Sequence, residues 1–209
     1  MQGGGKATMV LAIESDLVVL DFESTGACEG HPNLPWQIGA VFFRHGRVLP
    51  EHCLVSHLRV PESHPFNPYA PGRWAAIRAE LAQSPSLLEL WPQLSPWLTG
   101  RPLAAHHAPT ERSLLRQTFA FHDFPHWVDS LVLARAAYPG LESYQLGDLL
   151  GTLGLMEKTR LACPGREAHD ALFDAVACGY LLEHILSQPG WRDARLDDLI
   201  ALGTGRNGG

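Results

Sequence analysis

The stretch Leu17-Val18-Val19-Leu20-Asp21-Phe22-Glu23 decides how the rest of the chain is interpreted. Its first four residues are apolar, which is typical of a buried strand. Asp21 and Glu23 stand two apart at its end, and because side chains alternate along a strand, both carboxylates face the same side. Two like charges beside a core repel, so one would take up a proton unless a cation lies between them. A divalent metal ion resolves this conflict; the alternative is a strand end that runs into solvent with two hydrated acids.

The composition is that of a water-soluble globular protein. The chain has 209 residues, of which 45% are hydrophobic and 18% are charged, and its formal net charge is −6. This charge argues against a basic module that wraps nucleic acid, but it does not exclude a nucleic-acid enzyme, because a site built of carboxylates adds negative charge. No apolar run approaches the roughly 18 residues that cross a bilayer, and the first residues do not read as a secretory signal. We therefore expect a cytoplasmic protein that makes no membrane contact.

The length favours one domain, which we place at residues 9–203. Residues 1–8 and 204–209 are rich in glycine and predict flexible tails. The four cysteines have no C-x-x-C spacing and lie far apart, so free thiols are expected rather than a disulfide framework.

The segments around the first strand predict a mixed α/β sheet flanked by helices. Residues 36–43 and about 48–56 read as two further strands joined at His45-Gly46, which suggests a three-strand antiparallel meander. Two short strands are expected at 103–106 and 127–130, each followed by a helix. The remaining expected helices lie near 73–83 and 86–98, from Pro109, over the leucines of 146–153, and from about 169 to 187. A loop is expected between Gly154 and Ala168.

Two residues late in the chain could join the acidic pair. His169 and Asp174 open the segment HDALFDA, where five residues turn a helix by about 500°, so they share no face if both lie well inside it. We therefore place His169 at the helix entrance. Asp174 projects from a largely apolar helix, where an unpaired charge is costly. Taken alone, His169 could equally be a capping or surface histidine, and Asp174 a solvent-facing acid one turn from Asp170.

Four motifs in this order resemble the DnaQ-like 3'-5' exonucleases of the DEDDh type. They are DFESTG at 21–26, HHAPTE at 106–111, YQLGDLLGTLGL at 144–155 and HDALFDA at 169–175. The resemblance covers roughly residues 15–186. It implies the ribonuclease H-like fold, a five-stranded mixed sheet in which parallel strands extend the meander.

The same resemblance implies a two-metal mechanism with Mg2+ or Mn2+. Asp21 would bridge both ions, Glu23 and Asp174 would hold the ion that carries the attacking water, and Glu111 would support the second ion. His169 would be the general base. Substrate contacts are expected at Ser24, Thr25, Gly26, His106 and Arg166. The implied reaction removes nucleoside 5'-monophosphates from single-stranded DNA or RNA 3' ends.

Two departures from the family pattern affect these expectations. The second motif usually ends in Asp, whereas this chain has Glu111, one methylene longer. A Glu in the first turn of a helix opened by Pro109 is also what the helix dipole favours, so a purely structural role is the alternative. The segment that many relatives use near the 3'-terminal nucleotide reads Trp74-Ala75-Ala76-Ile77 here. Lys158, Arg160 and Arg166 fall in the expected loop before His169, where cations could meet substrate phosphates.

A second function remains open at this stage. The chain could be a catalytically weakened ribonuclease H-like module that binds nucleic acid or a polymerase partner, and fold alone would not separate the two. The residues favour the enzyme, because all four acids and the histidine are chemically competent. DNA against RNA, the biological role, and monomer against homodimer are left undecided.

Overall fold

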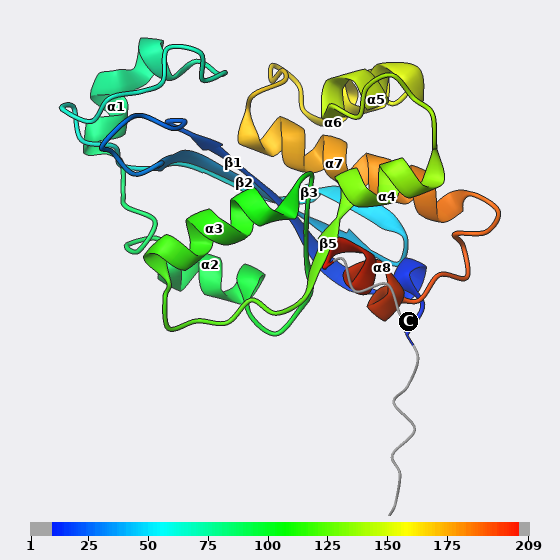
Figure 1. Cartoon of the computed structure of the whole chain (residues 1–209). Helices are drawn as coiled ribbons and strands as arrows, with labels where there is room; N and C mark the ends of the chain where they lie inside the picture. Colours follow the sequence, from blue (N-terminus) through cyan, green and yellow to red (C-terminus); the bar gives the residue numbers. More distant parts are fainter. Residues whose placement is uncertain (1–9, 205–209) are drawn as a thin grey trace, which may run out of the picture.

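The computed structural model describes residues 10–204 (Figure 1). The described elements, in chain order, are η1 (Ala12–Glu14), β1 (Asp16–Ser24), β2 (Pro35–Arg44), β3 (Arg47–His57), η2 (Trp74–Ile77), α1 (Arg78–Gln83), α2 (Trp91–Leu98), β4 (Leu103–Ala105), α3 (Ala108–Thr118), β5 (Trp127–Asp129), α4 (Ser130–Ala137), α5 (Leu146–Thr152), α6 (Met156–Ala162), α7 (Ala171–Ser187) and α8 (Leu196–Gly203). The predicted tails fall almost wholly outside this range. Thr204 is described, and its N–H and hydroxyl groups both donate to the Ala201 carbonyl oxygen at the end of α8.

The five strands form one mixed sheet in the order β3-β2-β1-β4-β5. β1 pairs antiparallel with β2, and β2 pairs antiparallel with β3, which confirms the predicted meander. β4 and β5 add to the other side of β1 as parallel strands. β1 is therefore a central strand, and Leu17 to Leu20 are apolar on both of its faces because helices cover both faces of the sheet.

Helices cover both faces of the sheet (Figure 1). On one face α7 packs with α4, α5, α6 and α8, and on the other face α2 and α3 form a second apolar layer. Successive residues of β1 divide between these layers, with Leu17 and Val19 in the first and Val18, Leu20 and Phe22 in the second. α7 is buried around most of its circumference, so its sequence is apolar almost throughout.

Three expectations need correction. The expected loop between Gly154 and Ala168 contains α6, because Leu155 and Thr159 lie one turn apart and are both buried. Lys158 therefore sits on a helix, and its ammonium group pairs with Glu183 at 2.7 Å. The expected helix at 86–98 begins only at Trp91, with a proline in its first turn, where no backbone N–H is needed. The strand expected at 103–106 ends at Ala105, and the one at 127–130 ends at Asp129.

Residues 10–204 include no helix long and apolar enough to span a membrane. The sequence-based expectation on this point concerned apolar runs over the whole chain. The finding covers only the helices of the described residues.

Gly39 on β2 lets α7 approach the sheet closely. A Cβ atom built at this position would lie 2.2 Å from the Ala171 carbonyl carbon and from the Leu172 nitrogen, both of them backbone atoms. Backbone cannot move aside as a flexible side chain can, so any larger residue must displace the start of α7. The start of α7 is also the part of the helix that carries Asp174.

We predict that Gly39→Ala lowers the free energy of unfolding by about 3 kcal/mol, because overpacking at this contact shifts α7. Urea unfolding followed by circular dichroism measures the change. Gly151→Ala in α5 is the matched control, since an added Cβ there meets nothing within 4 Å. The control should be neutral or stabilising by up to about 1 kcal/mol. Equal stability of Gly39→Ala and the wild type would contradict the close-approach argument.

Candidate active site

Asp21 and Glu23 point toward the face of the sheet that α7 covers. Leu17 and Val19, which share their side of β1, belong to the core layer under α7, so the period of two carries both acids to that side. Asp21 pairs across the sheet with Gly39, directly beneath the start of α7. Glu23 is only 6% exposed, which excludes a strand end with two hydrated acids.

A network of side chains fixes the first turn of α7. Asp170 is the N-cap residue: the Leu172 and Phe173 N–H groups donate to its Oδ1 at 3.1 and 3.2 Å. The Gln37 amide on β2 donates to Asp170 Oδ2 at 3.0 Å and accepts from the Ala171 N–H at 3.0 Å. Helix and strand are thus joined by hydrogen bonds at the point where β1 carries Glu23.

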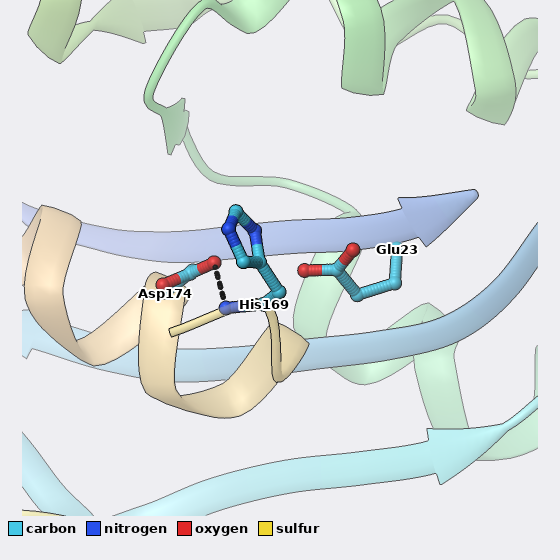
Figure 2. A group of neighbouring side chains, drawn as sticks. All are labelled: Glu23, His169 and Asp174. Carbon is cyan, nitrogen blue, oxygen red and sulfur yellow. Dashed lines mark hydrogen bonds between the residues drawn. The ribbon is translucent and has the colours of Figure 1, made fainter. Parts of the chain in front are cut away.

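His169 lies just outside α7 and turns back toward the acids. Its backbone has φ +67°, a left-handed conformation that non-glycine residues rarely adopt, and its N–H donates to Asp174 Oδ2 at 3.0 Å. The side chains of Glu23, His169 and Asp174 each place one ligand atom within 4.8 Å of the others (Figure 2). The five-residue spacing therefore brings His169 and Asp174 together across the helix entrance. Asp170, not His169, caps the helix.

Glu111 reaches the same region from the opposite layer of helices. It lies in the first turn of α3, is only 3% exposed, and its Oε2 atom is buried without a hydrogen-bond partner. After burial, its charge is one of the causes that raise the pKa of Asp21. A glutamate that served only the helix dipole would gain more from an exposed position, because a buried unpaired carboxylate is costly.

Asp129, at the end of β5, sets the start of α3. The His107 and Ala108 N–H groups donate to its two carboxylate oxygens at 3.2 and 3.1 Å, and the Leu131 N–H donates at 3.0 Å. His107 has φ +75°, and the bond to Asp129 holds it there. Asp129 itself is 3% exposed. Asp129 therefore joins the starts of α3 and α4, and through α3 it positions Glu111.

Burial and mutual repulsion raise the pKa values of the two acids of β1. Burial, followed by the charges of Glu111, Asp174 and Glu23, raises the pKa of Asp21 well above its usual value. Burial, followed by the charge of Asp174, raises the pKa of Glu23 to about 8. At neutral pH such a pair stays ionised only when positive charge is supplied.

The two acids on the helices are affected in the same way. Burial is the main cause that raises the pKa of Glu111 to about 8, and the charge of Asp129 adds to it. Burial raises the pKa of Asp174 to about 6, although the His169 N–H and ring act in the opposite direction. Glu23, His169 and Asp174 can each offer one ligand atom to a common cation, and burial disfavours the charged forms of Asp21 and Glu111 as well.

Comparison with known proteins agrees with this arrangement. The exonuclease family model RNase T matches residues 18–182. The chain belongs to this family. Among solved structures, Exonuclease X in complex with 5' overhanging duplex DNA is 23% identical with a TM-score of 0.65, covering 88% of this chain and 99% of that chain. The nuclease domain of 3'hExo, a DEDDh family member bound to rAMP, is 12% identical with a TM-score of 0.66, covering 89% and 98%.

A third structure, E. coli Exonuclease I in complex with a dT13 oligonucleotide, is 16% identical with a TM-score of 0.63 and covers 83% of this chain and 41% of that chain. A sequence search among curated proteins gives no match. At these identities the neighbours show a shared fold, the ribonuclease H-like mixed sheet of the DEDDh exonucleases. The resemblance stated from the motifs is thereby confirmed for family and fold.

The expected substrate contacts of this exonuclease domain have different surroundings. The hydroxyl of Thr25 accepts from the Leu34 N–H at 3.0 Å, and Thr25 is fully buried. Gly26 has φ +74°, and an added Cβ would lie 2.8 Å from Asn67 Cβ, so this turn requires glycine. Ser24, at the end of β1, is partly exposed. Arg166 binds Asp170 Oδ2 at 2.6 Å and so supports the entrance of α7.

The ring of His106 is bound inside the protein. Its Nε2 donates to the Tyr144 carbonyl oxygen at 2.9 Å, so the neutral ring accepts at Nδ1 from the Ser130 hydroxyl at 2.8 Å. Burial lowers the pKa of His106, which keeps the ring neutral. Ser130 in turn accepts from the Cys178 thiol at 3.2 Å. The described contacts give His106 a role in joining three segments, and its substrate contact stays a prediction.

Sequence reasoning missed Asp129 and Gln37, which hold the two helix starts. Asp129 follows a short apolar strand and precedes a helix, so it carried an N-cap signal. Gln37 sits within an apolar strand, where a buried amide needs partners. Neither signal says which distant backbone groups the side chain will bind.

We predict that the metal-free protein loses stability as pH rises from about 5 to 8. Because the folded-state pKa values of Glu23 and Glu111 are raised to about 8, the native state binds more protons than the unfolded chain between about pH 4 and 8. The free energy of unfolding then falls by up to about 1.4 kcal/mol per pH unit for each such proton. Denaturant melts in EDTA measure this slope.

Glu111→Gln isolates one of these groups. The variant should have a shallower slope than the wild type, since one of the protons is no longer exchanged. Glu142→Gln, a change at an exposed position, should keep the wild-type slope. If both variants behave alike, Glu111 is not held neutral in the folded protein.

We also predict that Asp129→Asn weakens metal binding at a distance. An amide offers one acceptor oxygen, so a backbone N–H at the start of α3 loses its partner, at a cost of about 1–3 kcal/mol. The displaced helix start carries Glu111 with it. The variant should therefore show a smaller rise in melting temperature with Mg2+ than the wild type, whereas Asp16→Asn, in an exposed ion pair, should keep the full rise. An unchanged Mg2+ response in Asp129→Asn would refute the positioning role.

Proposed function

We propose that the protein is a metal-dependent 3'-5' exonuclease that releases nucleoside 5'-monophosphates from single-stranded DNA or RNA 3' ends. The observation that carries this proposal is the group of four acids, with Glu23 and Glu111 buried, Asp21 and Asp174 half-buried, and His169 beside them. Glu111 Oε2 has no partner among the described residues, and the raised pKa values mark a site short of positive charge. Exonuclease I with dT13 and 3'hExo with rAMP support a nucleic-acid substrate.

Asp21, Glu23, Glu111 and Asp174 would hold Mg2+ or Mn2+, two ions in all. When bound, these ions neutralise the acids and stabilise charge on the attacking and leaving oxygens of an in-line displacement. The charges of Glu111, Asp174 and Glu23 all act on Asp21, so it would be the residue that the two ions share. Their ligands come from three elements, β1, α3 and α7, whose starts and ends are fixed by the contacts described above.

His169 would act as the general base. Its side chain is exposed, so a proton taken from the attacking water can pass on to solvent. The water oxygen forms a bond to phosphorus, and the bond to the 3'-oxygen of the preceding nucleotide breaks. The terminal nucleotide leaves as a 5'-monophosphate, and the shortened strand keeps a 3'-hydroxyl. A cavity of about 550 Å3 beside His169, lined partly by Trp36, Arg73 and Ile77, offers room next to the base.

We predict that the purified protein shortens 5'-labelled single-stranded DNA or RNA from the 3' end in Mg2+ or Mn2+ but not in EDTA. His169→Ala should lower turnover roughly 10²- to 10⁴-fold while it keeps the Mg2+-induced rise in melting temperature. Asp21→Asn should remove both the turnover and the Mg2+-induced rise in melting temperature. His52→Ala, at an exposed position on β3, is the matched control and should behave as the wild type.

The same assay tests the alternative of a catalytically weakened binding module. That alternative requires that the wild type binds the labelled strands and leaves them intact with either metal. If His169→Ala keeps wild-type turnover, the metal site still stands but His169 is not the general base.

A further inference from the structure

A second cavity of about 550 Å3 lies outside the candidate active site, between α3 and the end of α8. Its polar lining comes from Arg112, Ser113, Arg116, Gln117 and Thr204. Trp127 forms part of its apolar wall. The catalytic proposal makes no use of these side chains.

Two arginines in this cavity lack a partner of opposite charge. Arg112 and Arg116 stand one turn apart on α3, and neither forms an ion pair with any acid in residues 10–204. The Nε atom of Arg112 is buried without a hydrogen-bond acceptor. Like charges one turn apart repel, and a buried unpaired N–H is costly, so the arrangement favours an anion.

The one acid that lines the cavity, Asp129, forms no ion pair with either arginine. Asp129 contributes to the wall, but its oxygens accept from the N–H groups of His107, Ala108 and Leu131. The Ser113 hydroxyl and the Gln117 amide supply further donors. A planar guanidinium binds phosphate through two N–H groups, so a phosphate fits this set of donors.

The cavity is adjacent to the candidate active site. Ala108 and Pro109, at its rim, open α3, and Glu111 lies in the same first turn. At 1.5 Å per residue, Arg116 is about 7.5 Å further along the helix axis than Glu111. The arginines therefore lead away from the acids on the helix that carries Glu111.

We propose that this cavity, the α3–α8 cleft, binds a backbone phosphate of the substrate strand on the 5' side of the nucleotide being removed. This inference rests on the proposed function, because it assumes a nucleic-acid strand with its 3' end at the acids. The chain has a net charge of −6, and a polyanionic substrate needs local cations to approach it. The cleft supplies two of them beyond the scissile bond.

The experiment compares strands of different length. Fluorescence anisotropy with Ca2+ in place of Mg2+ measures binding of labelled oligothymidylates of 2, 4, 8 and 12 nucleotides. The wild type should bind the 12-mer more tightly than the dimer. Arg112→Gln/Arg116→Gln should lose most of that difference, with at least a tenfold weaker 12-mer complex and a salt slope smaller by about 0.7, as expected for one lost phosphate contact on a single strand.

Two further variants complete the design. Arg192→Gln, which also removes an exposed arginine, should keep the wild-type length dependence. Arg112→Lys/Arg116→Lys retains both charges but not the paired N–H donors, so it should fall between the wild type and the glutamine variant. A thermal melt shows whether each variant is folded. If the glutamine variant does not fold, the lysine variant tests the proposal in its place.

The outcomes separate this proposal from the proposed function. Full length dependence in a folded glutamine or lysine variant overturns the α3–α8 cleft as a strand site, even if the wild type is an active exonuclease. Loss of length dependence in the Arg192→Gln control as well would show a general charge effect and would also overturn it. Absence of hydrolysis by the wild type in Mg2+ and Mn2+ refutes the enzyme, while the binding series still tests the cleft.

Discussion

Repulsion among four carboxyl groups, two of them buried and two half-buried, is the constraint on which the rest of this structure depends. Asp21 and Glu23 from β1, Glu111 from α3 and Asp174 from α7 each have a raised pKa, mainly through burial. A protein gains nothing in stability from such a group without cations. The proposed function gives these carboxyl groups a use as ligands of divalent ions.

The fold holds this unfavourable group together with equivalent contacts at two helix starts. Asp170 caps α7 and is joined to β2 through Gln37, while Asp129 caps α4 and also receives two N–H groups from the start of α3. α3 and α7 carry Glu111 and Asp174 in their first turns, so the positive ends of these two helix dipoles offset part of the repulsion. Gly39 completes the arrangement, because only the absence of a Cβ lets α7 lie so close to β2.

Glu111 departs from the aspartate that the family resemblance implies at the end of the second motif. It is 3% exposed, and its charge is one of the causes that raise the pKa of Asp21. The α3–α8 cleft lies on the same helix as Glu111, and two arginines that form no ion pair within residues 10–204 line it.

The sequence by itself determined the local patterns: the alternation that places Asp21 and Glu23 on one side of β1, the antiparallel meander, and the position of His169 before α7. These follow from periods of 2 and 3.6, which neighbouring residues impose. Tertiary structure alone decided that loop residues around Lys158 form α6, that His106 is bound between Ser130 and Tyr144, and that Asp129 controls Glu111. Each of these features depends on partners tens of residues away. The sequence also does not distinguish a buried acid from an exposed one, because only tertiary packing removes water from the carboxyl group.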